Sequence, residues 1–290
     1  MLSKNKKKIV SSVFLAVLLL LAALRYAWVA GCFQRADGGG TVLFSFLDVG
    51  QGDAILIRSP AGAILIDTGP DNAGQDLSDN LSAKGVEDLC MLFLTHGDSD
   101  HAGNADRVLQ TCNVAALLLP DSHTVSGSVR AAERAASDRG TAVSRLCAGD
   151  VLYSGDLVIA VLSPFSPPEG EENTDSLVLR VTYGATSVLL TGDADIAAEE
   201  RILRYTAPEE LRCDILKLGH HGSRTSTSEA FLTAAAPQYA VISCGKANSF
   251  GHPHSETLLR LQNAGIPVLR TDEIGEITFR SDGKTAEQVK

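Results

Sequence analysis

Histidine and aspartate are concentrated in one short segment of this 290-residue chain. The segment Thr95–His101 reads THGDSDH, so two histidines and two aspartates fall within six consecutive positions. It follows an apolar, strand-like run and precedes an expected helix, so its side chains can converge at the end of a strand. Such polar groups are costly to desolvate without a partner, and a simple helix N-cap needs no histidine. We therefore expect four metal ligands, shared between two ions: His96, Asp98, Asp100 and His101.

Most of the remaining histidines fall in two further clusters. The segment GHHG contains His220 and His221, and the segment GHPH contains His252 and His254. The first pair directly follows an apolar, strand-like run, so it is a candidate for the same site. His123 stands alone and is expected at the surface.

Apolar runs of four to eight residues alternate with helical stretches, which favours one α/β domain. Strands are expected at 42–47, 54–57, 63–66, 89–94, 115–119, 157–162, 177–181, 187–190, 214–218, 239–242, 267–269 and 276–279. Helices are expected at 76–84, 103–111, 126–139, 195–205, 228–235 and 255–264. The tract 163–173, rich in Pro, Glu and Gly, predicts a surface loop. This pattern suits two mixed sheets packed face to face, with helices outside, over residues 41–282 and a polar tail at 283–290.

Three segments together resemble a known family. FLDVGQGDA at 46–54, THGDSDH and LKLGHHGS at 216–223 resemble the metallo-β-lactamase superfamily, and within it the metallo-hydrolase domain of the ComEC/Rec2 competence proteins. Asp98 stands where the family signature has its second histidine. The resemblance runs from about residue 42 to 279. It implies an αββα sandwich and a hydrolase that activates water with a pair of metal ions.

The resemblance also implies roles for single residues. Asp67, in LIDTG, braces the metal loop by hydrogen bonds, and Asp193, in LLTGD, bridges the two metals. The family's third motif supplies a histidine about twenty residues before that aspartate, and here the position falls near Asn173. Amide oxygen is a poorer ligand than imidazole, so one metal position is weakened. Asp53 and Ser223, from the resembling segments, are expected around the site.

The last histidines admit two assignments. By analogy with related hydrolases, we expect His252 to be a ligand of the second metal and His221 to act as general acid or phosphate contact. The reverse assignment stays open. His220 either takes part in the site or is a packing histidine, and His254 is expected at the edge of the site or on the surface.

Carboxylate-rich ligand sets favour manganese or magnesium, and mixed sets also admit zinc. We expect two divalent ions, with Mn²⁺ preferred over Zn²⁺. Asp100 and Asp193 would hold an activated water in line for attack on a phosphoryl group. Lys217, Ser223 or Arg224 could neutralise the developing charge. The alternative for Lys217 and Arg224 is that they are solvated surface charges.

The amino-terminal segment, residues 1–40, is expected to be a signal or membrane anchor followed by a short glycine linker. Lys4–Lys8 is basic, and 9–24 is apolar apart from two serines. This segment fits an uncleaved anchor, a lipoprotein signal with Cys32 lipidated, or a cleaved signal. All three place the rest of the chain outside the cytoplasmic membrane, because basic flanks stay inside.

Five cysteines lie beyond residue 40, an odd number that cannot all pair within the chain. Cys90, Cys213 and Cys244 lie beside strand-like runs, so we expect buried free thiols there. The same region carries 19 basic and 34 acidic residues. With this excess of acidic residues, the region lacks the basic surface that nucleic-acid binding usually needs. Two bound divalent ions would add positive charge at the site.

Two classes of function are therefore in competition. The first is an exported phosphodiesterase, most simply a DNA nuclease of the ComEC type, or a hydrolase of small substrates such as a lactone, a thioester or a cyclic phosphodiester. The second is a non-enzymatic binding protein whose metal site has decayed at the third motif. DNA or a small phosphodiester is the expected partner, with a membrane contact through the amino-terminal segment. No protein partner follows from the sequence.

Overall fold

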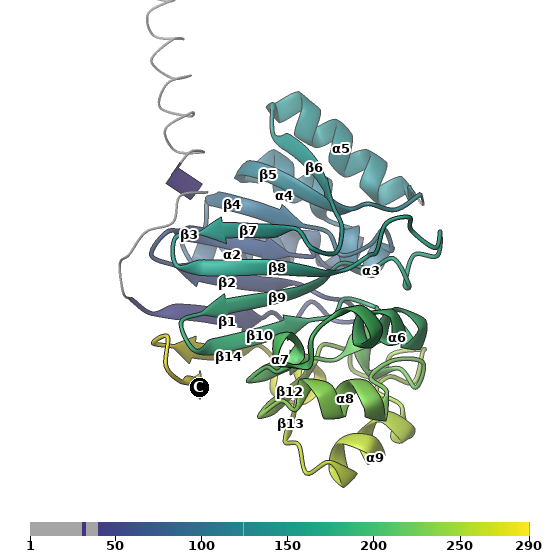
Figure 1. Ribbon diagram of the computed structural model, residues 1–290. Coiled ribbons are helices and arrows are strands. Elements are labelled where there is room, and N and C mark those ends of the chain that lie inside the picture. The colour runs from purple at the N-terminus through teal and green to yellow at the C-terminus, as the bar shows by residue number, and fades with distance from the viewer. Residues whose placement is uncertain (1–30, 33–39, 124, 290) are drawn as a thin grey trace, which may run out of the picture.

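The protein is a sandwich of two β-sheets with helices on both outer faces (Figure 1). The computed structural model describes residues 31–32, 40–123 and 125–289. Within these ranges one sheet has eight strands, in the order β15-β14-β1-β2-β3-β4-β5-β6, and the other has seven, in the order β13-β12-β11-β10-β9-β8-β7. Both sheets are mixed, so the expected αββα architecture is confirmed.

The first sheet is antiparallel on one side and parallel on the other. Strands β14, β1, β2 and β3 pair antiparallel, whereas β3, β4, β5 and β6 pair parallel. Its strands are β1 (Val42–Phe46), β2 (Ile55–Ser59), β3 (Gly62–Ile66), β4 (Asp88–Phe93), β5 (Asn113–Pro120), β6 (Ala142–Leu146), β14 (Ile277–Ser281) and β15 (Ala286–Val289).

The second sheet repeats this division. Strands β7 to β10 form an antiparallel meander, and β10 to β13 are parallel. Its strands are β7 (Val151–Ser154), β8 (Leu157–Ser163), β9 (Val178–Tyr183), β10 (Thr186–Leu190), β11 (Ile215–Lys217), β12 (Tyr239–Ile242) and β13 (Val268–Arg270).

Helices cover each sheet on its outer side. The first sheet is covered by α2 (Gly74–Ala83), α4 (Ala105–Thr111) and α5 (Gly127–Arg139), and the second by α6 (Ile196–Tyr205), α8 (Glu229–Ala235) and α9 (Ser255–Asn263). Shorter turns complete the described chain: η1 (Asp71–Ala73), α3 (Ser99–Ala102), α7 (Pro208–Leu211), η2 (Gly219–Gly222) and α10 (Thr271–Ile274).

Alternation along the strands explains why both faces of each sheet are buried. In β3, Ile64 and Ile66 enter the layer between the sheets, while Ala63 and Leu65 pack under the helices. Successive side chains of a strand point to opposite faces, so a continuous apolar run serves two layers at once. The expected strands and helices are therefore present, with ends that differ by a few residues.

Three strands were not expected from the sequence. Strands β6 and β7 have mostly exposed or half-buried side chains, so they lack the apolar run that marks a buried strand. The stretch 283–290, expected as a polar tail, contains the edge strand β15, which pairs antiparallel with β14. An edge strand buries little of its surface, so its polar composition gave no sign of pairing.

The prediction of a free thiol at Cys90 is wrong. Its Sγ forms a disulfide with Cys32, while Cys112, Cys147, Cys213 and Cys244 are free. Cys32 lies in the expected signal segment, and without it the domain has an odd number of cysteines. In a lipoprotein, Sγ of Cys32 would carry the lipid and could not form this disulfide.

The expected signal or anchor falls on residues 1–30 and 33–39, outside the described residues. Within the described ranges, no helix combines the length and apolar character that a membrane span requires.

Candidate metal centre

The predicted site residues gather at one edge of the sandwich. Asp67 directly follows β3, His96 lies three residues after the end of β4, Asp193 lies three residues after β10, and His221 lies four residues after β11. Parallel neighbours end at the same edge of a sheet, which is where open α/β sheets place their ligands. Asp53 joins them from the opposite direction, because it precedes β2, which runs antiparallel to β3.

Four buried side chains form the centre of this site. Ligand atoms of Asp53, His101, Asp193 and His221 all lie within 4.8 Å of one another. The Nε2 atom of His101 lies 3.0 Å from Oδ1 of Asp193 and 3.2 Å from Nε2 of His221. Two imidazoles and two carboxylates at this spacing are the donor set of a divalent metal site.

The hydrogen bonds of the two imidazoles fix which nitrogen faces the centre. Nδ1 of His101 lies 2.7 Å from a carboxylate oxygen of Asp67, and Nδ1 of His221 lies 2.9 Å from the carbonyl oxygen of Ser243. Both partners accept hydrogen bonds, so each Nδ1 carries the proton and donates it. Each Nε2 of a neutral ring then presents a lone pair to the other. That arrangement is repulsive unless a cation lies between them, so these residues fit a metal ion.

Asp67 holds the loop that carries the predicted ligands. Its carboxylate accepts hydrogen bonds from the backbone N–H and the hydroxyl of Thr95, each at 2.7 Å, and from His101. Asp67 has a positive φ of 58°, a strained backbone conformation that is tolerated where the surroundings fix it. This strain at a non-glycine residue supports a positioning role for Asp67.

The charges of the centre shift its pKa values in opposite directions. Burial alone would lower the pKa of His101, but the carboxylates of Asp193, Asp67 and Asp53 outweigh it and raise that pKa well above its usual value. Burial alone would raise the pKa of Asp193, but His101 and His221 outweigh it and hold that pKa well below its usual value. A proton therefore binds where a metal ion would otherwise bind.

The remaining predicted ligands surround this centre. Oδ2 of Asp100 lies 3.1 Å from Nε2 of His221. Nε2 of His96 lies 3.5 Å from Asp98 and 4.0 Å from Asp193. Asp193 thus lies between the group around His101 and the group around His96.

Asp53 lies deeper in the site than the sequence indicated, and its partner is unexpected. Its carboxylate pairs with the ammonium of Lys217, which is fully buried and also donates to the carbonyl oxygen of Gly192 at 3.3 Å. This excludes the alternative that Lys217 is a solvated surface charge. A lysine at the carboxyl end of a central strand could have been recognised as a buried partner, because β11 (Ile215–Lys217) lies between two parallel neighbours.

Gly52 allows the loop before Asp53 to approach the ligand-bearing turn. A Cβ atom at Gly52 would lie 2.3 Å from the carbonyl oxygen of Asp100, and its φ is +148°. Next to it, the backbone N–H of Asp53 donates to the same carbonyl at 3.1 Å. Gly52, the second glycine of the DVGQGDA segment, is therefore required by close backbone packing.

His252 and His220 lie at the rim of the site. The ring of His252 is 6.1 Å from that of His221 and 5.4 Å from that of His220, and its Nδ1 has no hydrogen-bond partner. Burial, with His221 and His220 close by, lowers the pKa of His252 to about 4. Nε2 of His220 lies 3.7 Å from Asp193, and its Nδ1 lies 3.4 Å from the amide of Asn173. The structure thus brings His221, rather than His252, into the central group.

The residues after His221 form a firmly held turn. The hydroxyl of Ser223 contacts that of Thr225 at 2.9 Å, and the backbone N–H of Arg224 donates to Nδ1 of His254 at 3.1 Å. The side chain of Arg224 is exposed. His123 is also exposed, as expected.

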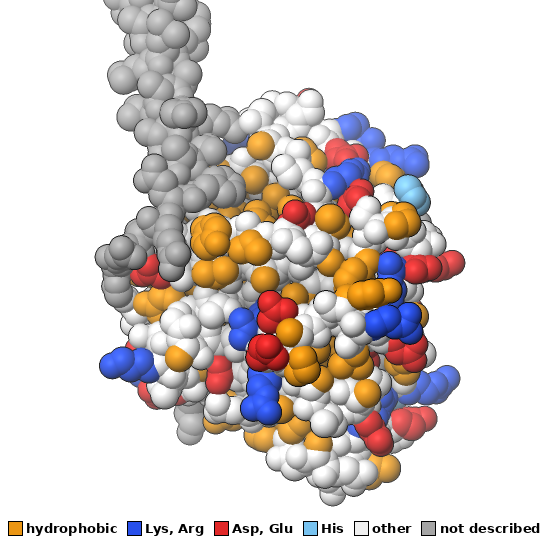
Figure 2. Space-filling view, viewed as in Figure 1, with side chains coloured by type: hydrophobic (Ala, Val, Ile, Leu, Met, Phe, Trp, Pro, Cys, Tyr) orange, Lys and Arg blue, Asp and Glu red, His pale blue; other side chains and the backbone are white. Residues whose placement is uncertain are grey.

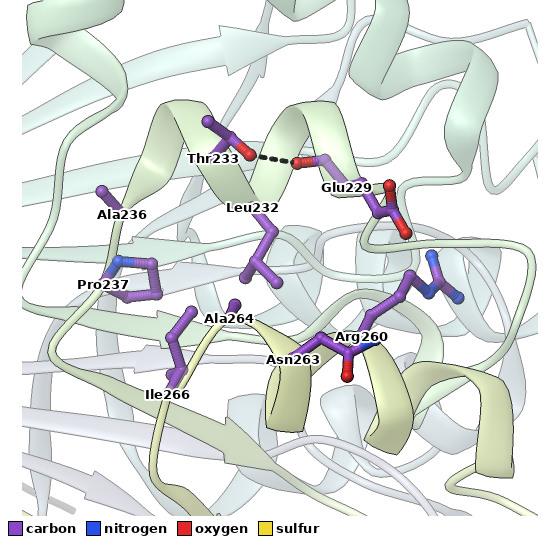
Figure 3. Close-up of a pocket in the computed structure, with 9 residues that line it drawn as sticks. All are labelled: Glu229, Leu232, Thr233, Ala236, Pro237, Arg260, Asn263, Ala264 and Ile266. Carbon is purple, nitrogen blue, oxygen red and sulfur yellow. Dashed lines mark hydrogen bonds between the residues drawn. The ribbon is translucent and has the colours of Figure 1, made fainter.

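A separate hollow of about 570 Å³ lies between α8 and α9 (Figure 3). Leu232, Pro237 and Ile266 line it, together with Arg260 and Asn263. None of the predicted ligands lines it. The guanidinium of Arg260 donates to the carbonyl oxygens of Ser226 at 3.0 Å and of Thr227, so it supports the turn that follows His221.

The fold and the buried Asp/His group define a metallo-hydrolase architecture, and comparison with known families agrees. The description "Metallo-beta-lactamase superfamily" matches residues 47–246, so the chain belongs to this superfamily.

Its sequence is further similar to proteins named for competence and recombination. It is 37% identical over 252 residues to ComE operon protein 3 of Bacillus subtilis, covering 81% of this chain and 32% of that protein. It is 36% identical to competence protein ComA of Neisseria gonorrhoeae, covering 80% of this chain and 31% of that protein. The resemblance to the ComEC/Rec2 type is thereby confirmed, and the chain spans about a third of the length of these relatives.

Solved structures show the same fold at low sequence identity. The metallo-β-lactamase fold protein YhfI of Bacillus subtilis aligns with a TM-score of 0.58 at 12% identity, over 83% of this chain and 100% of that one. CmlA of Streptomyces venezuelae, a diiron β-hydroxylase, aligns with a TM-score of 0.58 at 14% identity, over 83% of this chain and 54% of that one.

Proposed function

We propose that this chain is an exported, metal-dependent phosphodiesterase that cleaves DNA. The observation that carries the proposal is the pair of Nε2 atoms of His101 and His221 facing each other beside Asp193. This donor set suits a divalent ion. A pair of such ions would activate water and neutralise charge on phosphoryl oxygens. The competence and recombination relatives support a nucleic acid as the substrate.

The side chains divide into two groups around Asp193. His101 and His221, with Asp100 beside them, would hold an inner ion. His96 and Asp98 would hold an outer ion. Asp67 keeps the His101 ring oriented, because it accepts the Nδ1–H hydrogen bond and leaves Nε2 free for the ion.

In this proposal His221 is the ligand and His252 stays outside the central group. The first expectation from the sequence made His252 the ligand and His221 the general acid or phosphate contact. The proposal takes the reverse assignment, which the sequence had left open. His220 and His252 then remain at the rim. Their rings lie 5.4 Å apart, and His220 is about a quarter exposed, at 28% of its side chain. In this proposal the two rings would contact the substrate at the rim beside Asp193.

Charge decides how much DNA the domain can bind by itself. Residues 41–290 carry an excess of acidic groups, and on the face shown in Figure 2 the Lys and Arg side chains are interspersed with Asp and Glu side chains. Affinity for a polyanion would then come from the metal ions rather than from a basic track. The same observation favours a second candidate, a hydrolase of small phosphodiesters or of other small substrates.

The proposed ligands are three carboxylates and three imidazoles, and we propose Mn²⁺ ahead of Zn²⁺ because carboxylate oxygens suit Mn²⁺ better than an all-imidazole set would. The export part of the proposal rests on the basic and apolar amino-terminal sequence and on the disulfide of Cys32 with Cys90, because disulfides persist in oxidising compartments.

The test is a screen of metals against substrates on the purified full chain. The protein is stripped with EDTA and reloaded with Mn²⁺, Zn²⁺ or Mg²⁺, and each form is assayed on plasmid DNA, single-stranded DNA and bis-p-nitrophenyl phosphate. Cleavage of DNA that needs metal and is lost in Asp100→Ala supports the proposal. Turnover of the small ester alone supports the second candidate. Intact substrates with every metal would contradict both candidates and favour a binding protein.

A further inference from the structure

His96 has an imidazole nitrogen that no other group satisfies. Its side chain is 1% exposed, and its Nε2 has no hydrogen-bond partner. The same atom lies 3.5 Å from Oδ2 of Asp98 and 4.0 Å from Oδ2 of Asp193. A buried imidazole nitrogen without a partner is costly, so this atom points to a ligand between the two carboxylates.

A third carboxyl group lies beside Asp98, on the loop between β8 and β9. The side chain of Glu172 is in hydrogen-bonding contact with that of Asp98. Its Oε1 also lies 3.0 Å from the position that a Cβ atom would take at Gly97, between His96 and Asp98. Glu172 and His96 line the same small hollow. A side chain at position 97 would first meet Ser126, whose Oγ lies 2.8 Å from that position, so the backbone at Gly97 packs closely between Ser126 and Glu172.

The loop that carries Glu172 is held in place from within. The carboxylate of Asp175 accepts hydrogen bonds from the backbone N–H groups of Glu169 at 2.9 Å and Gly170 at 2.7 Å. Just beyond this loop, the N–H of Leu177 donates to the carbonyl of Thr95 at 2.8 Å, directly before His96. The position of Glu172 against the metal loop is therefore built into the fold.

Two carboxyl groups in contact must share either a proton or a cation, because two bare carboxylates repel each other. With a cation, both groups can be ionised. The nearby amide of Asn173 is directed to His220 instead.

We propose that Glu172 is a ligand of the outer metal ion, together with His96, Asp98 and Asp193. It would supply the group that the resemblance led us to expect as a histidine near Asn173, and so complete a position that the sequence indicated as weakened. A set of three carboxylates and one imidazole suits a hard ion such as Mn²⁺. This inference rests on the proposed function, since it assumes that the site binds metal.

The test compares Glu172→Gln with Glu171→Gln, a neighbouring exposed glutamate that serves as the matched control. Glutamine keeps the size of the side chain and can still hydrogen-bond to Asp98, so the fold should be retained, as thermal unfolding of both variants will show. Bound Mn²⁺ is counted by equilibrium dialysis with elemental analysis, and electron paramagnetic resonance distinguishes coupled pairs of ions from single ions.

The parent chain and Glu171→Gln should bind two equivalents, with the spectrum of a coupled pair. Glu172→Gln should bind the second ion at least about tenfold more weakly, which is the lower limit for loss of even an outer partner of a ligand, and should show the spectrum of a single ion. Two equivalents of unchanged affinity in Glu172→Gln would overturn the inference, as would a single equivalent in the parent chain. A parent chain that binds no metal would instead contradict the proposed function.

Discussion

The Nε2 atoms of His101 and His221 lie 3.2 Å apart, although the Nδ1 atom of each ring already donates its proton to another acceptor. Two lone pairs can face each other at this distance only if a proton or a metal ion lies between them. The two residues come from different sheets, so the pairing depends on the whole sandwich and not on one motif.

Replacing each of two histidines should decide which one is the ligand. We expect His221→Ala to lose the inner metal ion, because its Nε2 belongs to the central group. We expect His252→Ala to keep its metal and lose turnover, because its ring lies 6.1 Å from that of His221. Metal content by elemental analysis, with activity measured on the same samples, checks both. Loss of metal in His252→Ala alone would restore the first expectation from the sequence.

Removing the negative charge of Asp67 should weaken metal binding without removing a ligand. In Asp67→Asn the amide can no longer hold His101 in the same protonation state, and loss of such a partner typically costs about 10- to 100-fold in affinity. Titration calorimetry with Mn²⁺ measures the change. Asp138→Asn, on the exposed side of α5, is the control and should bind as the parent does. Equal affinities in the two variants would argue against a positioning role for Asp67.

The metal-free protein should lose stability as pH rises. The pKa of His101 is raised in the folded protein. Its contribution to the free energy of unfolding is therefore complete below its pKa in the unfolded chain, about 6.5, and is lost as pH rises through its pKa in the folded protein. The pKa of Asp193 is lowered in the folded protein. Its contribution to the free energy of unfolding is therefore complete above its pKa in the unfolded chain, about 3.9, and is lost as pH falls through its pKa in the folded protein. Urea unfolding in EDTA should therefore give its highest free energy of unfolding between these limits.

Metal binding should show the opposite trend with pH. The ion displaces the proton held by His101, so affinity should increase as pH rises towards the folded pKa of that group. Calorimetry in buffers of different ionisation enthalpy counts the protons released. Affinity independent of pH, with no proton released, would show that His101 does not carry the proton.

Lys217 should be needed to keep Asp53 ionised inside the protein. Breaking a buried ion pair by removing one partner typically costs about 3–5 kcal/mol, because the other charge stays buried without compensation. We expect Lys217→Met to lose that much in urea unfolding with EDTA present. Adding Asp53→Asn should recover part of the loss, since the uncompensated charge is then gone. If Lys217→Met is as stable as the parent, water or another cation must replace the ammonium group.

Thiol chemistry should report the disulfide and the burial of the other cysteines. Of the six cysteines, four should react with Ellman's reagent in denaturant without reductant. In the native protein only Cys147 should react readily, because it is the one that is not buried. Burial raises the pKa of Cys213 and of Cys244 to about 12, which keeps these thiols protonated. Six reactive thiols in denaturant would contradict the pairing of Cys32 with Cys90.

Much of the fold could be predicted because its strands are apolar on both faces. Such strands as β4 and β5 are visible as continuous apolar runs. Strands β6 and β7, with mostly exposed side chains, give no such signal. The missed elements therefore lie where burial is lowest.

The metal loop could be predicted from spacing alone, since its four groups lie on one turn after one strand. The choice between His221 and His252 could not, because it depends on how two distant loops fold back onto β11 and β12. Residues His220 and His221 both have positive φ values, 49° and 54°, which turn the chain sharply at this point. Glu172 carried no sequence signal, because it lies in a loop whose path is set by Asp175.

The division of the centre between the two sheets has a mechanical consequence. The loops of one sheet supply Asp100 and His101, and those of the other supply Asp193 and His221, so a bound ion would link the two layers at the open rim of the sandwich. Elsewhere apolar packing holds the two layers together, but at this edge polar side chains replace it. Binding of the ion would restrict the movement of one sheet relative to the other. Removal of the ion would leave this rim as the region where the two sheets separate first.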